Sequence, residues 1–301
     1  MRYPTPQAFR AALDQRLKNE AASSGVALMR LRKRVAFERF LARMSATGST
    51  GWMLKGAFAL ELRLGLRTRA TKDIDLARAD DEEAATEHLQ AAAASDLGDF
   101  FAFDVRRTPA LDTVTEVRAV RHTVRAELAG RRFEQFPVDV AIGEHSLSEV
   151  EWLPGPNLLA FAGIQAPDLP LIALDRHIAE KIHAYTRVYG PGGRRSTRVK
   201  DLIDIVLISD LTQLDAGRLR HALEDTFTRR AMQMLPEAVP APPRSWARPY
   251  AEIAHQVGAA PSLDEGHAIV AALLDPILSL TTTSGTWDRD TKCWRTPTAD
   301  G

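Results

Sequence analysis

The sequence has 301 residues, 45% of them hydrophobic, with 39 basic and 39 acidic side chains, which is typical of a globular protein and excludes disordered and fibrous classes. Its single cysteine, Cys293, excludes an internal disulfide framework and a cysteine metal cluster. Because the net charge is zero and only seven of the basic residues are lysines, any phosphate-binding surface must be a local patch built mainly of arginine.

The first half of the chain predicts two amino-terminal helices followed by a sheet. Apolar residues recur first at helical spacing and later in alternation with polar residues. Helices are expected at 7–45 with a break near 23–25, at 57–64, and from a cap at Asp80 and Asp81 to about residue 95. Strands are expected at 52–54, 71–77, 100–107, about 112–126 and 133–142.

The second half predicts a helical domain. Four prolines between residues 154 and 170 indicate a linker or crossing segment. Helices are expected at 174–188, 198–209, 214–228 and 264–280, with a basic loop at 189–197, a proline-rich stretch at 236–249 and a loosely ordered end at 281–301. We therefore expect an α+β protein with a mixed-sheet domain at residues 1–153 and an α-helical domain at residues 154–301. No signal-peptide core or uninterrupted apolar span is visible, so we expect a cytoplasmic protein without a membrane partner.

Three aspartates in apolar strands predict a metal site. Asp73 and Asp75 are two residues apart and share one face of their strand, and Asp139 lies in a second apolar strand. Carboxylates in apolar strands are costly unless a cation neutralises them, and oxygen ligands favour magnesium or manganese. For the first two aspartates alone, a strand-end turn or a solvated edge is the better interpretation. The third carboxylate favours a two-metal site.

Two further segments are candidates for binding phosphate. Lys55-Gly56-Ala57 precedes a helix, whose free N–H groups favour an anion, although this signal is weak alone. Residues 176–200 contain seven basic side chains against only Glu180. Among them is Lys181, which as a lone lysine is more simply explained by a rim position with its ammonium in water.

Asp201 and Asp204 open the next helix and share a face, where they either complement the helix dipole or orient the lysine and arginines.

The ordered set of motifs resembles the AbiEii/AbiGii nucleotidyltransferase toxins, a group within the polymerase-beta-like nucleotidyltransferase superfamily. The motifs are Lys55-Gly56-Ala57, Arg69 to Leu76, Val138-Asp139-Val140, Ala179-Glu180-Lys181 with Arg187, and Arg198 to Asp204. Where this chain has Ala57-Phe58, the family commonly has glycine followed by threonine or serine. We therefore expect only backbone contacts to phosphate from Gly56 and Ala57.

The resemblance implies the toxin of a bacterial toxin–antitoxin or abortive-infection pair, which transfers a nucleoside monophosphate from an NTP to RNA. In studied branches the acceptor is the 3′ end of tRNA, and the modification blocks translation and growth. By the same resemblance Asp73, Asp75 and Asp139 would bind Mg²⁺ or Mn²⁺, Lys181 would contact the triphosphate and Asp201 would be a late catalytic acid. The residues expected to bind the nucleotide are Lys55, Gly56, Ala57, Arg69, Thr71, Lys181, Arg187, Arg198 and Asp204. The expected partner is an antitoxin of the AbiEi-like winged-helix type.

Two arginine-rich stretches are candidates for binding the acceptor RNA by its backbone. They are residues 187–198 and a set at Arg106, Arg107, Arg118, Arg121, Arg125, Arg131 and Arg132, part of which we expect to form ordinary cross-strand ion pairs. Two alternatives stay open: transfer to a small molecule or a protein hydroxyl, and a non-catalytic nucleotide-binding or RNA-binding module.

Overall fold

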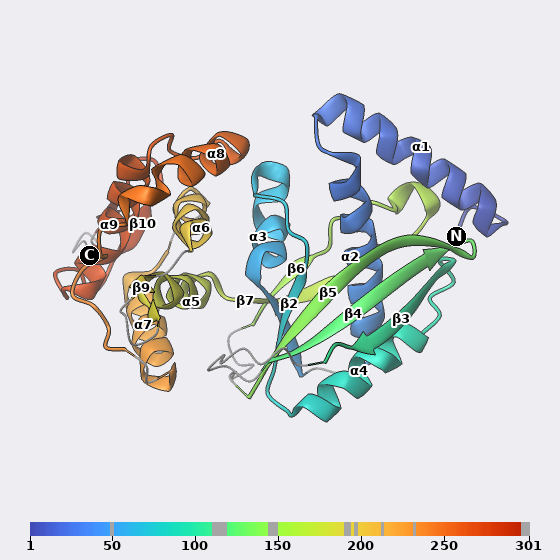
Figure 1. Cartoon of the computed structure of the whole chain (residues 1–301), viewed down its shortest axis with the longest axis horizontal. Helices are drawn as coiled ribbons and strands as arrows, with labels where there is room; N and C mark the ends of the chain where they lie inside the picture. The colour runs from blue at the N-terminus through green and yellow to red at the C-terminus, as the bar shows by residue number, and fades with distance from the viewer. Residues whose placement is uncertain are drawn as a thin grey trace, which may run out of the picture. The chain divides into compact units, whose positions relative to one another are not determined.

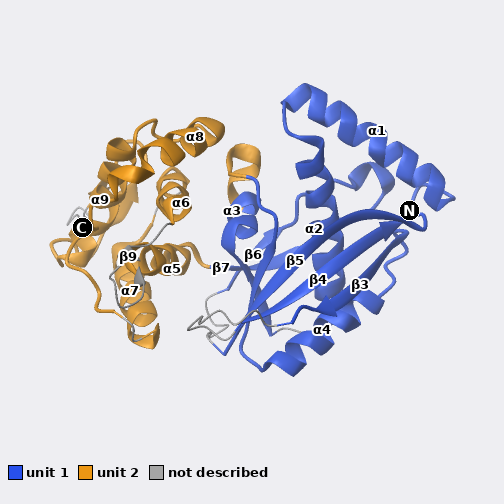
Figure 2. Cartoon of the chain, viewed as in Figure 1, with its two compact units in different colours: residues 1–62, 70–172 blue, residues 63–69, 173–301 orange. Residues whose placement is uncertain are grey.

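The computed structural model describes residues 1–48, 51–109, 119–143, 150–189, 194–195, 198–211, 214–230 and 233–295. It has two compact units, one of residues 1–62 and 70–172 and one of residues 63–69 and 173–301 (Figure 2). The sequence predicts a boundary near residue 153, whereas the units divide at Ile172 and Ala173. None of the described helices combines the length and the apolar character that a membrane span requires.

The first unit is built around a seven-stranded mixed sheet with the strand order β3-β4-β5-β2-β1-β7-β6 (Figure 1). Strand β2 runs parallel to β5, and β1 runs parallel to β7, whereas the other neighbouring pairs are antiparallel. Its strands are β1 (Trp52–Lys55), β2 (Ile74–Arg78), β3 (Phe101–Arg107), β4 (Ala119–Leu128), β5 (Arg131–Ile142), β6 (Val150–Pro154) and β7 (Asp168–Ile172). Its helices are α1 (Pro6–Ser24), α2 (Leu28–Ala46), α3 (Gly56–Leu64), which ends in the second unit, α4 (Glu82–Ala94) and the short 3-10 helix Ala160–Ala162.

The helix boundaries follow from local capping. Helix α1 starts where the Thr5 hydroxyl accepts a hydrogen bond from the backbone N–H of Ala8, and it ends at Gly25, whose φ of 70° suits glycine. The carboxylate of Asp81 caps α4 by accepting from two backbone N–H groups of its first turn. The break near residue 25 and the acidic cap of α4 are therefore confirmed.

One face of the sheet packs against α2, which lies on the same side as α4 (Figure 1). The ring of Phe136 on β5 lies 4.7 Å from that of Phe37 and 6.0 Å from that of Phe40, both on α2. Val138 and Val140 share the orientation of Phe136 and are fully buried. By alternation, Asp139 points to the opposite face of the sheet.

Buried charges interrupt the apolar face of α2. Asp99 accepts hydrogen bonds from Arg43 at 2.6 and 2.9 Å and from Arg39 at 2.7 Å, and all three residues are buried. Burial alone would raise the pKa of Asp99, but the two guanidinium groups hold it below its usual value. This cluster ties α2 to the start of β3.

The second unit is mainly helical, as predicted. It contains the 3-10 helices Gly65–Arg67 and Arg244–Trp246, helices α5 (Leu174–Thr186), α6 (Val199–Ser209), α7 (Ala216–Arg230), α8 (Ala247–Val257) and α9 (Leu263–Leu278), and the short strands β8 (Val188–Tyr189), β9 (Arg194–Arg195), β10 (Thr286–Asp288) and β11 (Cys293–Arg295). Helix α6 contacts α5, α8 and α9, and all its residues except Lys200 are buried, which makes it the centre of this unit.

Several expectations from the sequence are corrected. The segment 154–172 is not simply a linker, because β7 pairs with β1 and β6 inside the sheet. The end of the chain includes the hairpin β10–β11, with a fully buried Trp287 whose indole N–H donates to the Ser209 carbonyl at 3.0 Å. Helix α8 was not expected. The strand expected at 112–126 is described only from Ala119, and the strand expected at 71–77 begins at Ile74.

Candidate active site

Three carboxylates converge at the centre of the sheet in the first unit. Asp75 on β2 is the direct cross-strand partner of Asp139 on β5, and Asp73 lies one residue before β2. One carboxylate oxygen from each of the three lies within 4.8 Å of the other two, and all three side chains are partly exposed. The structure therefore brings together the three aspartates that the sequence identified, although the strand itself does not include Asp73.

The convergence belongs to a row of charges that crosses four neighbouring strands in direct register. Arg121 on β4 is opposite Asp139, Asp139 is opposite Asp75, and Asp75 is opposite Lys55 on β1. Residues in direct register point to the same face of a sheet. The row therefore reads cation, anion, anion, cation on the face opposite α2.

Arg121 makes a bidentate ion pair with Asp139. Its Nε and Nη2 atoms lie 2.6 Å from the two carboxylate oxygens. The hydrogen bonds with Asp139, and then its charge, raise the pKa of Arg121. Arg121 belongs to the stretch that was a candidate for RNA binding and was expected in part to form cross-strand ion pairs, but its contact with the carboxylate site was not predicted.

Thr71 orients the first aspartate. Its hydroxyl group donates to Asp73, with the carboxylate Oδ1 at 2.9 Å and the backbone carbonyl at 3.2 Å, and the residue is buried. Thr71 was expected to bind the nucleotide. In this structure it holds the Asp73 side chain against its own backbone.

Gly56 approaches Asp75 too closely to carry a side chain. Its φ is +68°, and a Cβ atom built on it would lie 1.8 Å from Oδ2 of Asp75. Only glycine meets both conditions without strain. The amino-terminal end of α3, whose first N–H groups have no partner within the helix, is thereby held beside a carboxylate of the triad.

This arrangement fits a small divalent cation. A set of three carboxylates supplies only oxygen ligands, which are those that Mg²⁺ and Mn²⁺ prefer. The fit rests on the mutual distance of the three oxygens and on the space that Gly56 leaves beside Asp75.

A second cluster of predicted residues lies in the second unit. The Nζ atom of Lys181 on α5 lies 2.7 Å from Asp204 Oδ2 and 3.4 Å from Asp201 Oδ1, both on α6. The guanidinium of Arg69 donates to both carboxylate oxygens of Asp204 at 3.1 and 3.2 Å, and that of Arg198 donates to Asp201 at 3.2 Å. Asp201 and Asp204 therefore contact the basic side chains, as expected if the two aspartates orient them.

Lys181 is not the solvent-facing rim lysine that the lone residue suggested, because its side chain is only 7% exposed. Burial lowers the pKa of Lys181, but Asp204 and Asp201 overcome that effect and hold the pKa above its usual value. Burial would raise the pKa of Asp204, whereas Lys181 and Arg69 hold it below its usual value. The cluster is thus ionised on both sides.

His177 is buried four residues before Lys181. Its pKa is well below the usual value because of burial and, next, the charge of Lys181. It is therefore neutral beside the charged cluster.

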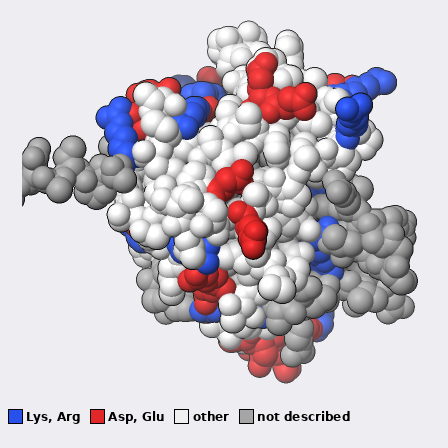
Figure 3. Space-filling model, turned by 90° about the vertical axis from the view of Figure 1, so that its left-hand side faces the viewer, with Lys and Arg blue, Asp and Glu red and all other residues white. Residues whose placement is uncertain are grey.

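Burial and ion pairing reduce the exposed positive charge of the two basic stretches that the sequence identified. Arg176 and Lys181 are buried, Arg187 is half-buried, and the side chains of Arg194 and Arg195 lie outside the described part. In the other stretch Arg118 is not described, and four arginines pair with acids. The pairs are Arg106–Asp104, Arg107–Glu82, Arg121–Asp139 and Arg125–Glu127. On the face seen in Figure 3, most described residues are uncharged, and lysines and arginines lie mainly toward its margins.

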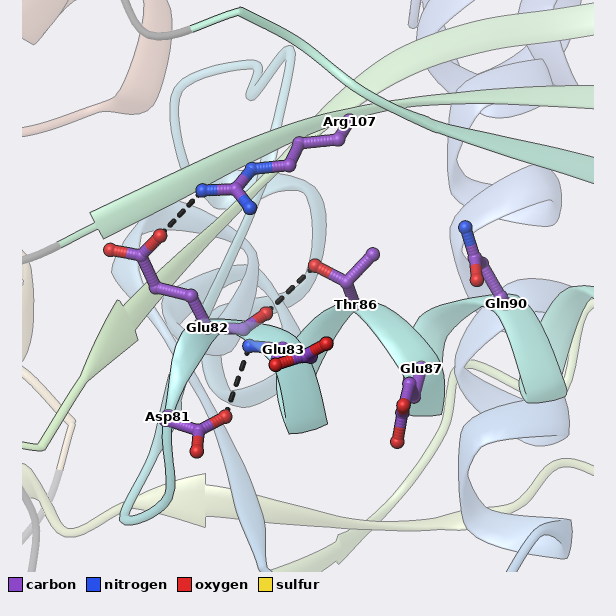
Figure 4. Close-up of a pocket in the computed structure, with 7 residues that line it drawn as sticks. All are labelled: Asp81, Glu82, Glu83, Thr86, Glu87, Gln90 and Arg107. Atoms are coloured by element: carbon purple, nitrogen blue, oxygen red, sulfur yellow. Dashed lines mark hydrogen bonds and ion pairs between the residues drawn. The ribbon is translucent and has the colours of Figure 1, made fainter.

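A hollow of about 650 Å³ beside α4 is a different kind of surface (Figure 4). Its described lining includes Asp81, Glu82, Glu83 and Glu87, together with Arg107, which pairs with Glu82. Negative side chains repel phosphate, so this hollow does not suit a nucleotide.

Comparison with solved structures supports the fold through one match, and a second match is weaker. The MenT4 nucleotidyltransferase toxin of Mycobacterium tuberculosis H37Rv is 22% identical, with a TM-score of 0.50 over 70% of this chain and 68% of that chain. A structure described as a putative nucleotidyltransferase from H. pylori is 17% identical, with a TM-score of 0.44 over 83% of this chain and 96% of that chain. No curated protein matches the sequence.

The sequence also matches a family model. The model describes the nucleotidyl transferase AbiEii toxin of type IV toxin–antitoxin systems, and the match covers residues 39–276. These residues include the carboxylate triad of the first unit and the Lys181 cluster of the second. Because the match covers well over half of the chain, this protein belongs to the AbiEii family of nucleotidyltransferase toxins of type IV toxin–antitoxin systems.

Proposed function

We propose that this toxin transfers a nucleoside monophosphate from an NTP to the 3′-hydroxyl of an RNA, with the acceptor end of tRNA as its target. The observation that carries the proposal is the convergence of Asp73, Asp75 and Asp139, with one oxygen of each within 4.8 Å of the others. Such a modification would block translation and stop growth, in keeping with a toxin family.

The proposed role of the three aspartates is to hold Mg²⁺ or Mn²⁺. When bound, the cation neutralises charge on the phosphates and favours ionisation of the attacking hydroxyl. Thr71 fixes the orientation of Asp73 through its hydroxyl group. Gly56 leaves room for Asp75 at the start of α3.

We assign phosphate binding to two groups of residues, each within its own unit. In the first unit, the backbone N–H groups of Gly56 and Ala57 and the ammonium group of Lys55 would bind the triphosphate. In the second unit, Lys181 would be a charged phosphate-binding lysine, positioned by Asp201 and Asp204.

Three other predicted basic residues of the second unit have separate proposed roles. Arg69 would stabilise Asp204 and Arg198 would stabilise Asp201, because each donates to that carboxylate. Arg187, at the carboxyl end of α5, is proposed to face phosphate.

In the proposed reaction the RNA 3′-oxygen forms a bond with the α-phosphorus while the bond from the α-phosphorus to the bridging oxygen breaks. Pyrophosphate leaves with the bonding pair, and the proton of the hydroxyl passes to solvent or to a carboxylate of the triad. Positioning and charge neutralisation supply most of the acceleration in such a step.

A small acceptor is the second candidate. Four of the arginines first considered for RNA binding pair with carboxylates of the protein, which leaves less free positive charge for an RNA backbone. The family implies an antitoxin, and we propose one of the AbiEi-like winged-helix type.

Incubation with labelled NTPs, magnesium and total RNA tests the proposal. We expect label in RNA, lost in Asp73→Ala and Asp75→Ala and retained in Asp104→Ala, which removes an exposed acid on β3. Sequencing of RNA 3′ ends after brief induction identifies the acceptor. Label that enters only small molecules would favour the second candidate, and full labelling by the Asp75→Ala variant would refute the mechanism.

A further inference from the structure

The ion pair between Arg121 and Asp139 occupies a carboxylate that the proposed function needs for the cation. Both oxygens of Asp139 accept hydrogen bonds from one guanidinium group. A carboxylate oxygen has a limited number of acceptor positions, and a cation and an arginine repel each other at such short range. Binding of a divalent cation at the triad and the bidentate hold of Arg121 therefore compete.

Arg121 is well placed to move. Its side chain is 54% exposed, whereas that of Asp139 is 24% exposed. An ion pair with one partner in solvent contributes little stability to a fold, so exchange of its partner costs little. Arginine also binds phosphate oxygens with the same planar geometry that it uses on a carboxylate.

Arg121 reduces the electrostatic repulsion among the three carboxylates. Three carboxylates within 4.8 Å repel one another while they are ionised. The guanidinium group of Arg121 offsets the charge of Asp139 while no cation is bound. Once a divalent cation binds, it neutralises the carboxylates in place of Arg121. An anionic triphosphate at the same place would then attract the guanidinium group.

We propose that Arg121 is a displaceable counter-ion of the cation site, which leaves Asp139 when the divalent cation binds and then binds a phosphate of the nucleotide. This inference rests on the proposed function. It assigns a substrate-binding role to Arg121 in addition to its contact with the carboxylate.

Arg125 provides a matched control on the same strand. It lies four residues from Arg121, so its side chain emerges on the same face, and it is 50% exposed. Its ion pair is with Glu127 at 2.8 Å and not with the triad. If Arg121 had only an ordinary surface ion pair, it would behave like Arg125 in every measurement.

The test is calorimetric titration of the full chain with Mn²⁺ alone, followed by titration with NTP analogues that cannot be cleaved at the α-phosphorus, in saturating Mn²⁺. We expect Arg121→Gln to bind Mn²⁺ about fivefold more tightly than the parent and to bind the analogue about fivefold more weakly, in line with an exposed ion pair. Arg125→Gln should match the parent in both titrations. Arg121→Lys, which keeps the charge, should recover part of the nucleotide affinity.

The outcomes separate this inference from the proposed function. If the parent binds Mn²⁺ and labels its acceptor but Arg121→Gln binds Mn²⁺ no more tightly, the inference fails alone. If cation binding tightens but nucleotide binding is unchanged, the phosphate role of Arg121 is wrong. If the parent binds no Mn²⁺ and transfers no label, both proposals fail. Thermal melts of both glutamine variants show whether each is folded.

Discussion

The Lys181 cluster predicts a large and measurable loss of stability in Asp204→Asn. The substitution keeps the size of the side chain but removes a negative charge that is 1% exposed. It leaves two cations facing a neutral amide, one of them Lys181, whose side chain is 7% exposed. Removal of one partner from a buried ion pair costs about 3–5 kcal/mol.

The surroundings of Asp204 place the expected loss of stability at the lower end of about 3–5 kcal/mol. Arg69 is 19% exposed and can turn toward water when Asp204 loses its charge. Lys181 keeps a weaker contact with Asp201, at 3.4 Å. We therefore expect the lower end, about 3 kcal/mol in the free energy of unfolding. Asp201→Asn, whose carboxylate is 10% exposed and pairs partly with the exposed Arg198, should cost about 1 kcal/mol.

The pH dependence gives an independent check. In the parent the pKa of Lys181 is raised, so its contribution is fully present below the pKa of an unfolded lysine and is lost only as pH rises through the folded-state value. In Asp204→Asn we expect burial and the charge of Arg69 to outweigh Asp201 and to lower the pKa of Lys181, so that the unfolded chain binds more protons than the folded chain near pH 9. The stability deficit should therefore shrink between about pH 7 and about pH 10.

Urea unfolding followed by far-UV circular dichroism measures both effects. The double variant Lys181→Met with Asp204→Asn should recover part of the loss, because it removes the unpaired buried charge. Equal losses in Asp204→Asn and Asp201→Asn, or a deficit that does not change with pH, would refute the reasoning.

Two further predictions concern the carboxylate triad. Gly56→Ala should weaken Mn²⁺ binding at least about tenfold, because its Cβ atom would displace Asp75. Unchanged affinity in calorimetry would contradict this. Gly65→Ala is the control for backbone strain, because Gly65 has a φ of +65° and open space around it. Thr71→Val should weaken Mn²⁺ binding about tenfold because Asp73 loses the hydroxyl that orients it. Thr71→Ser should restore the affinity, and equal affinities of the valine and serine variants would show that the hydroxyl has no such role.

Sequence periodicity identified the three carboxylates of the triad but not the contact of Asp139 with Arg121. Alternation along a strand is a local property, so Asp75 and Asp139 could be assigned to faces without knowledge of the fold. The burial of Lys181 depends instead on α6, whose Asp201 and Asp204 are twenty or more residues further along the chain. A helical pattern on α5 contains no information about the helix that packs against it.

Strands β6 and β7 were not predicted because of the prolines in and around them. Proline usually indicates an interruption, and the four prolines between 154 and 170 favoured a linker. In the fold β6 is an edge strand, and Pro170 of β7 is opposite Trp152 of β6 within a ladder of five residue pairs. Pairing over the rest of the ladder maintains both strands.

The pairing of Asp139 with Arg121 depends on one β-bulge between β4 and β5, which the alternation of residues along each strand does not reveal. At the turn between β4 and β5, Glu127 is opposite Arg132, but the register shifts by one residue before Ala126. Without that bulge, Arg121 would be opposite Val138 and would point to the face that packs against α2. The bulge thus moves the guanidinium to the carboxylate face. A one-residue change in the β4–β5 connection would then be expected to alter cation binding without a change in any residue of the triad.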